Sequence, residues 1–144
     1  MARATLTGFE ELDSMLRKLA KPEIMAIKAV DAAAPVLEEA LRNEIKKAAD
    51  RKDSNGKPYS TGELAASIGR TKAQENKYGV YSVVKPGGTD SKGVRNVEKM
   101  AYLEYGVAAR GQVPHPVRMK SIKASEKECM QIMQEVVEKE IDKL

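Results

Sequence analysis

The chain has 144 residues, of which 42% are hydrophobic and 32% charged, and its formal net charge is +4. This size and balance suit one soluble globular domain with a core of its own. The single cysteine, Cys129, excludes an intrachain disulfide and any zinc site built from several cysteines. No apolar run approaches the roughly 18–20 residues of a membrane span. Residues 1–12 lack the apolar core of a signal peptide, so we expect an intracellular protein.

Residues 7–19 have the pattern of a short amphipathic helix. Thr7 and Glu10 match a capping box. The apolar residues that follow recur at helical spacing; they are Phe9, Leu12, Met15, Leu16 and Leu19. Lys21-Pro22 interrupts the pattern, so we treat residues 1–21 as an N-terminal helical extension of a single domain.

A long amphipathic helix is predicted from about Pro22 to Asp50. Its apolar positions are Ile24, Ile27, Val30, Ala34, Leu37, Leu41, Ile45 and Ala48. Pro35 lies inside this pattern, so we expect either a kink or two consecutive helices. Glu38 and Arg42 are spaced to form an ion pair one turn apart. Residues 51–60 then read as a polar loop, with Asn55-Gly56 and Pro58 as turn signals.

The segment TGELAASI, residues 61–68, predicts a helix of one to two turns. Thr61 is a candidate N-cap, and Leu64 and Ile68 lie on the inner side. Gly69 is expected to end this helix. Two strands are predicted next, at residues 70–74 and 78–85, around a turn at residues 75–77.

Residues 86–96, PGGTDSKGVRN, are predicted to form a flexible loop. The segment has three glycines and no periodicity, and a loop of this length favours function or disorder over mere connection. It lacks the Gly, Lys and Ser/Thr spacing of a phosphate-binding loop. Residues 97–107 fit a short helix and a strand about equally well.

Gly106 marks a position where the backbone needs freedom or has a close neighbour. Pro114-His115-Pro116 must be extended, because each residue before a proline is kept out of the helical region. A second long amphipathic helix is predicted from Val117 to Leu144. We assign it one apolar stripe, composed of Ile122, Ser125, Cys129, Ile132, Met133, Val136, Val137, Ile141 and Leu144. The fold class is therefore α+β, with two long helices packed on a small antiparallel sheet.

Few residues suggest chemistry. His115 is the only histidine, and it lies between two prolines. Glu104 is a carboxylate in an otherwise apolar stretch, and we expect it to be buried or half-buried and bonded either to backbone amides or to a basic partner such as Arg110 or Arg118. We assign no catalytic, metal-binding or cofactor-binding residue.

Two short motifs give the chain a family resemblance. The first is TGELAASI, with Thr61, Gly62, Leu64, Ser67 and Ile68. The second is AYLEYG, with Tyr102, Glu104, Tyr105 and Gly106, followed by Pro114 and Pro116. In this order, between two long helices, they resemble the tail-completion or head–tail joining proteins of long-tailed bacteriophages and prophages. The resemblance covers roughly residues 22–144. This chain has Val107 and Val117 where the family more usually has Thr and Phe.

The resemblance implies a non-catalytic virion structural protein of the neck, formed in the host cytoplasm and placed between head connector and tail tube. It implies a homo-oligomeric ring that contacts connector and tail-tube proteins. In that setting the loops at 51–60 and 86–96 are candidate contacts to neighbouring subunits. In the second loop these are Gly87, Gly88, Lys92 and Arg95.

Two other functions remain open from sequence. The sequence pI of about 9.1 and a net charge of +3 over residues 58–117 are compatible with a small nucleic-acid-binding regulator, or with a virion surface that faces DNA. An enzyme would have to be centred on Glu104 and His115, so the distance between these side chains is a simple test of that reading.

Overall fold

The computed structural model describes residues 12, 14, 16, 17, 21–49 and 62–144. The elements in chain order are α2 (Pro22–Ala49), α3 (Glu63–Ala66), β1 (Ile68–Arg70), β2 (Gln74–Asn76), β3 (Gly79–Tyr81), β4 (Val84–Pro86), α4 (Asn96–Tyr105), the 3₁₀ helix η1 (Ala108–Arg110) and α5 (Val117–Asp142). This confirms the predicted α+β class. The expected loop at 51–60 and the expected cap Thr61 lie outside the described residues.

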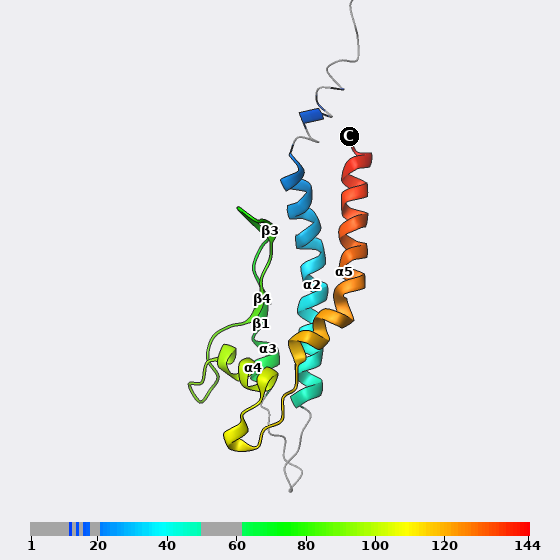
Figure 1. Cartoon of the computed structure of the whole chain (residues 1–144). Helices are drawn as coiled ribbons and strands as arrows, with labels where there is room; N and C mark the ends of the chain where they lie inside the picture. Colours follow the sequence, from blue (N-terminus) through cyan, green and yellow to red (C-terminus); the bar gives the residue numbers. More distant parts are fainter. Residues whose placement is uncertain (1–11, 13, 15, 18–20, 50–61) are drawn as a thin grey trace, which may run out of the picture.

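Helix α2 is the central element (Figure 1). The strands lie along one side of it, and α5 lies antiparallel to it along another side (Figure 1). Lys28 of α2 pairs with Glu140 of α5 at 2.8 Å, near the end of the helix pair where α2 begins. Toward the other end, Leu41 and Ile45 share a core cluster with Val117, the first residue of α5. Helix α5 therefore packs mainly on α2.

Pro35 lies within one continuous helix, so the alternative of two consecutive helices is wrong. An internal proline costs a helix about 3 kcal/mol in isolation. Here Ala33 and Ala34 beside it are buried, and the Cys129 thiol of α5 approaches the Ala33 carbonyl oxygen at 3.6 Å. Packing of an amphipathic helix supplies most of its stability in a protein, so the contacts with α5 hold the helix through the proline.

The four strands form one interrupted hairpin. β1 pairs antiparallel with β4 (Ile68 opposite Pro86), and β2 pairs antiparallel with β3 (Gln74 opposite Tyr81). Between the two ladders the Thr71 hydroxyl accepts a hydrogen bond from the Val83 amide at 3.0 Å. The Thr71 side chain thus substitutes for a backbone partner where the ladder is broken.

The predicted strand limits at 70–74 and 78–85, with a turn at 75–77, were wrong in detail. The turn comprises Lys77 and Tyr78, because the Asn76 side-chain oxygen accepts a hydrogen bond from the Tyr78 amide at 2.8 Å. Ile68 was assigned to a helix but begins β1, since helix α3 ends at Ala66. The segment at 97–107, left open from sequence, forms most of helix α4.

The main core lies where these elements meet. It comprises Leu41, Ile45, Ala65, Ile68 and Val117, with Ala48, Leu64, Val84, Met100 and Leu103 packed around it. Six elements contribute to it, so the core joins α2, α3, strands β1 and β4 of the hairpin, α4 and the start of α5. No helix among the described residues is both long enough and apolar enough to cross a lipid bilayer.

The predicted apolar stripe of helix α5 is covered only in part, because Ile122 and Ile141 of that stripe are 49% and 47% exposed. Ser121 and Ser125 are 1% and 3% exposed on the inner face, whereas Met130 is 61% exposed. The Ser125 hydroxyl donates to the Ser121 carbonyl at 2.7 Å, a bond to the preceding turn that favours helix bending. Figure 1 shows α5 bent in its first third.

Replacing a core residue tests the position of this core. Ile45 is 1% exposed. The Ile45→Ala variant is therefore expected to have an unfolding free energy about 2–5 kcal/mol below that of the wild type, because apolar burial is lost and a cavity is left behind. Urea unfolding followed by far-UV circular dichroism measures this loss. Ile24→Ala on the same helix, at a residue 50% exposed, is the matched control and should lose far less. Equal losses in the two variants would contradict the described core.

Candidate functional site

Glu104 supports the beginning of helix α5. Its Oε2 atom accepts a hydrogen bond from the backbone amide of Arg118 at 2.8 Å, and the residue is only 9% exposed. The first amides of a helix have no partner within it, and the N-cap residue of α5, Pro116, makes no side-chain capping bond. A carboxylate there also interacts favourably with the helix dipole. The prediction of a buried Glu104 bonded to a backbone amide is confirmed.

Gly106 is required by a close approach of two backbone segments. Its φ is +73°, and a Cβ atom would lie 2.6 Å from the Gln112 carbonyl oxygen and 2.9 Å from the Pro114 nitrogen. Just after this point the His115 amide donates to the Leu103 carbonyl at 2.7 Å. The chain therefore doubles back against the end of α4, and Gly106 has both the unusual backbone and the close neighbour that its sequence context predicted as alternatives.

The prolines direct the chain into α5. The Val117 amide donates to the His115 carbonyl at 2.7 Å across Pro116, whose φ of −74° and ψ of 68° describe an inverse γ-turn. Pro114 is exposed and Pro116 is half-buried. This rigid turn brings the first amides of α5 to the Glu104 carboxylate.

The first motif meets the second in the core. Leu64 and Ile68 share the core cluster with Leu103, which lies beside Glu104 in the second motif. The Ser67 hydroxyl donates to the Leu64 carbonyl at 2.7 Å, and the Ser67 carbonyl accepts from the Gly87 amide at 3.1 Å. Two motifs about forty positions apart thus form one structural unit.

The segment at 86–96 has a defined path in the structure. The Asp90 side chain, 3% exposed, accepts from the Lys92 and Val94 amides at 2.9 and 2.8 Å and pairs with Lys99. The hydrogen bond from Lys99 comes first among the causes that lower the pKa of Asp90. Asp90 and Lys99 were not predicted from the sequence, although Asp90 followed three positions later by Gly93 is a turn signature. Flexibility of this loop remains a prediction.

The loop is also held at its middle, and its two ends are tied together. Glu63 of α3 accepts hydrogen bonds from the Ser91 amide at 3.1 Å and from its hydroxyl at 3.2 Å. The Asn96 side-chain nitrogen donates to the Gly87 carbonyl at 2.8 Å. Four predicted contact residues of this loop are exposed, namely Gly87, Gly88, Lys92 and Arg95.

The same region exposes aromatic and apolar side chains. Tyr105 is 68% exposed and Tyr102 is 45% exposed on α4, and Val113 after η1 is 62% exposed. We call these three residues the α4 surface. Among the predicted assembly residues, Leu64, Ile68, Glu104 and Gly106 build the core and the junction, whereas Tyr102 and Tyr105 face outward.

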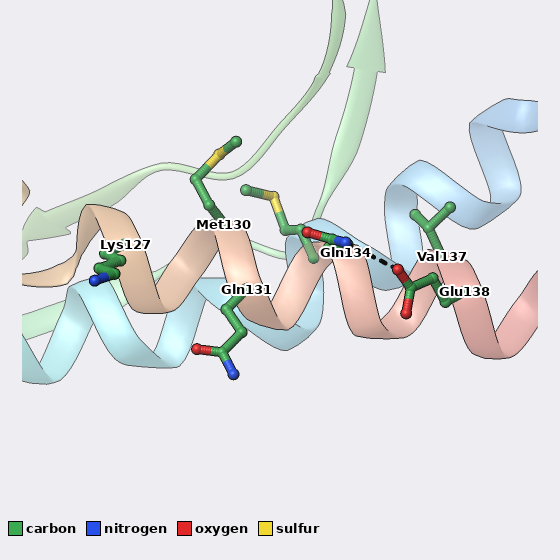
Figure 2. Close-up of a pocket in the computed structure, with 7 residues that line it drawn as sticks. Lys127, Met130, Gln131, Gln134, Val137 and Glu138 are labelled. Atoms are coloured by element: carbon green, nitrogen blue, oxygen red, sulfur yellow. Dashed lines mark hydrogen bonds between the residues drawn. The ribbon is translucent and has the colours of Figure 1, made fainter.

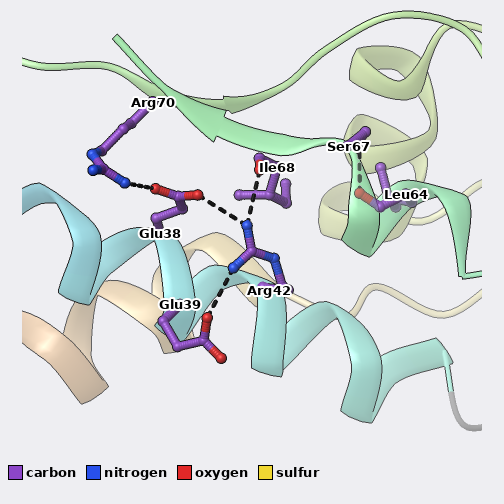
Figure 3. Close-up of polar contacts among 7 residues, drawn as sticks. All are labelled: Glu38, Glu39, Arg42, Leu64, Ser67, Ile68 and Arg70. Carbon is purple, nitrogen blue, oxygen red and sulfur yellow. Dashed lines mark hydrogen bonds and ion pairs between the residues drawn. The ribbon is translucent and has the colours of Figure 1, made fainter. Parts of the chain in front are cut away.

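A charged cluster fastens the hairpin to α2 (Figure 3). Glu38 lies between Arg42, at 2.9 Å, and Arg70 of β1. Arg42 also donates to the Ile68 carbonyl at 3.0 Å, and the Ala73 amide donates to Asp31 of α2 at 2.7 Å. The Glu38–Arg42 pair predicted from sequence is confirmed, whereas Arg70 was missed because only the folded hairpin brings it to α2.

No protein family, no curated protein and no solved structure matches this chain. Within the described residues, no three or more His, Cys, Asp or Glu side chains are grouped so that they could hold a metal ion.

The stability lost to a steric clash at Gly106 can be separated from the stability lost to a side chain at positive φ. Gly111 also has a positive φ, of +64°, but a Cβ atom there would meet nothing within 4 Å. Gly106→Ala is therefore expected to lose about 1–3 kcal/mol more unfolding free energy than Gly111→Ala, because only Gly106 faces a backbone clash. Urea unfolding measures both. Similar losses would show that close approach at Gly106 does not matter.

The Glu38 cluster predicts a specific pH dependence. The hydrogen bond from Arg70 is the largest cause that lowers the pKa of Glu38 from 4.5; burial opposes it and Arg42 supports it. A carboxyl with a lowered folded pKa stabilises the fold fully above its unfolded pKa and loses that contribution as the pH falls. Glu38→Gln is expected to lose about 1–2 kcal/mol at pH 7.

The difference between wild type and Glu38→Gln should shrink as the pH falls below 4.5 toward the lower folded pKa. Urea unfolding at a series of pH values from neutral to acidic measures it. Glu75→Gln, at an exposed position of β2, is the control for general acid effects. A difference that stays constant or grows at acidic pH would contradict the assigned role of Glu38.

Proposed function

We propose that this protein is a non-catalytic structural component of the head–tail junction of a long-tailed phage or prophage. It assembles there with head-connector and tail-tube proteins and with further copies of itself as a ring. The proposal starts from the two motifs, TGELAASI and AYLEYG, and their resemblance to tail-completion proteins.

The observation that carries the proposal is that both motifs converge on one core and junction. Leu64 and Ile68 from the first motif pack with Leu103 from the second, and Glu104 caps α5. Each of these polar and apolar groups has a structural task. This is the arrangement that a motif for a shared scaffold, rather than for chemistry, would produce.

The α4 surface supports a role in assembly. Tyr102, Tyr105 and Val113 lie close in sequence to the junction and are 45%, 68% and 62% exposed. Tyrosine is enriched at protein–protein interfaces because its ring buries a large area at a small cost in conformational entropy. Contacts with connector or tail-tube proteins are proposed there, and the exposed residues Gly87, Gly88, Lys92 and Arg95 are proposed contacts to neighbouring subunits.

The nucleic-acid-binding alternative has less support. Three of the basic residues within 58–117 are paired with carboxylates: Arg70 with Glu38, Lys99 with Asp90, and Arg95 with Glu98. Pairing reduces the positive charge available to phosphates. A gel-shift assay at low salt with duplex DNA distinguishes the two functions, since a regulator is expected to bind and a neck protein does not need to.

Binding to neck proteins is the direct test. We expect the purified protein to co-elute with a connector or tail-tube protein encoded by a neighbouring gene, as measured by size-exclusion chromatography with light scattering. Tyr105→Ser is expected to weaken this complex about tenfold or more, as loss of a central interface tyrosine does.

Tyr78→Ser is the matched control, because Tyr78 is an exposed tyrosine (85%) at the hairpin turn, away from the α4 surface. A complex weakened by Tyr78→Ser and unaffected by Tyr105→Ser would overturn the choice of surface. A protein that stays monomeric with every neck and tail partner offered would overturn the proposed function itself.

A further inference from the structure

The outer face of α5 is an apolar stripe with no cover in the described part of the chain. Met130 is 61% exposed, Ile141 is 47% and Met119 is 55%. Counting at 100° per residue places Met119, Met130, Val137 and Ile141 within about 40° of one another around the helix. The packing of α5 on α2 uses a different face, which carries the buried residues Ser121 and Ser125.

This stripe has the spacing of a helix-pairing seam. Met130, Met133, Val137 and Ile141 follow one another at intervals of three, four and four residues, close to the heptad pattern. Met130, Met133 and Val137 also line a shallow hollow of about 650 Å³. Figure 2 shows Met130 and Val137 on one side of the ribbon and Gln131 on the other. The hollow is lined by one helix alone, so a second helix would complete it.

The charge distribution along α5 is complementary to that of a second, antiparallel copy of α5. Its first part, residues 117–127, has four basic residues and one acidic residue, and residues 128–142 have five acidic and one basic. Lys127 and Glu138 border the same hollow on the same flank of the stripe. Two copies of α5 in antiparallel orientation bring Lys127 of each copy opposite Glu138 of the other. A parallel pair would place like halves together.

We propose that the outer face of α5 pairs antiparallel with the same face of a second copy of this chain. With Met130 of each copy level with Met133 of the other, the apolar stripes cover each other and Lys127 lies near the partner's Glu138. Such a contact has two-fold symmetry and is complete with two copies. The complementary charges favour this occupant over an unrelated helix.

This inference concerns the free protein and goes beyond the neck role. A ring needs head-to-tail contacts, whereas the α5 contact closes on itself at two copies. The paired state would therefore be a soluble form that covers the apolar stripe before assembly.

Sedimentation equilibrium on the full-length chain over a range of concentrations tests the proposal. We expect a monomer–dimer equilibrium whose dissociation constant rises about tenfold or more in Met130→Asp, because a charge would enter the seam. Lys127→Glu and Glu138→Lys are each expected to weaken the dimer about two- to fivefold, and the double variant should restore it. Glu128→Lys, about 160° around the helix from Met130, is the control and should leave the dimer unchanged.

Three results would overturn the proposal: a wild-type protein that is monomeric at every concentration, a dimer that Met130→Asp leaves intact, or a double charge reversal that fails to restore pairing. Far-UV circular dichroism confirms that each variant is folded. Binding to neck proteins is measured separately. A dimer formed through α5 by a protein that binds no neck component would remove the proposed function alone, and a monomer that binds such a component would remove this inference alone.

Discussion

The amides at the start of helix α5 need an acceptor, and Glu104 provides it. The carboxylate comes from the end of α4, so one hydrogen bond of 2.8 Å joins two helices that the chain connects only through a tight reversal. The reversal in turn needs Gly106, where no side chain fits, and the proline turn that places Val117 in the core. The direction of α5, and with it the packing of the whole helix pair, depends on this junction.

Helix α2 holds the remaining parts together because it packs on two sides. One side receives α5 through small residues, and this close packing maintains the helix through Pro35. Another side holds the hairpin through Glu38 and Asp31, two residues spaced two helical turns apart. The hairpin itself is narrow, with ladders of three residues each, so these polar ties to α2 supplement a small apolar contact.

The surfaces left over suggest how the chain is used. The junction residues contribute to the fold itself. The α4 surface and the outer face of α5 instead expose apolar side chains, which an isolated small protein does not need on its surface. We propose that the first surface contacts neck partners and the second another copy of the chain. The two surfaces lie on different elements, so one contact does not require the other.

The sequence by itself determined the long helices, their approximate limits, the α+β class and the burial of Glu104, because periodicity and local composition carry that information. It also determined the need for a special backbone at Gly106. Only the tertiary structure decided the continuity of α2 through Pro35, since packing outweighed a local penalty. The same holds for the hairpin register, which the Asn76 side chain and contacts with α2 adjust. Helix α5 shows the limit most clearly: its apolar residues formed one pattern in the sequence, and only the position of α2 separated the face that is buried from the face that is exposed.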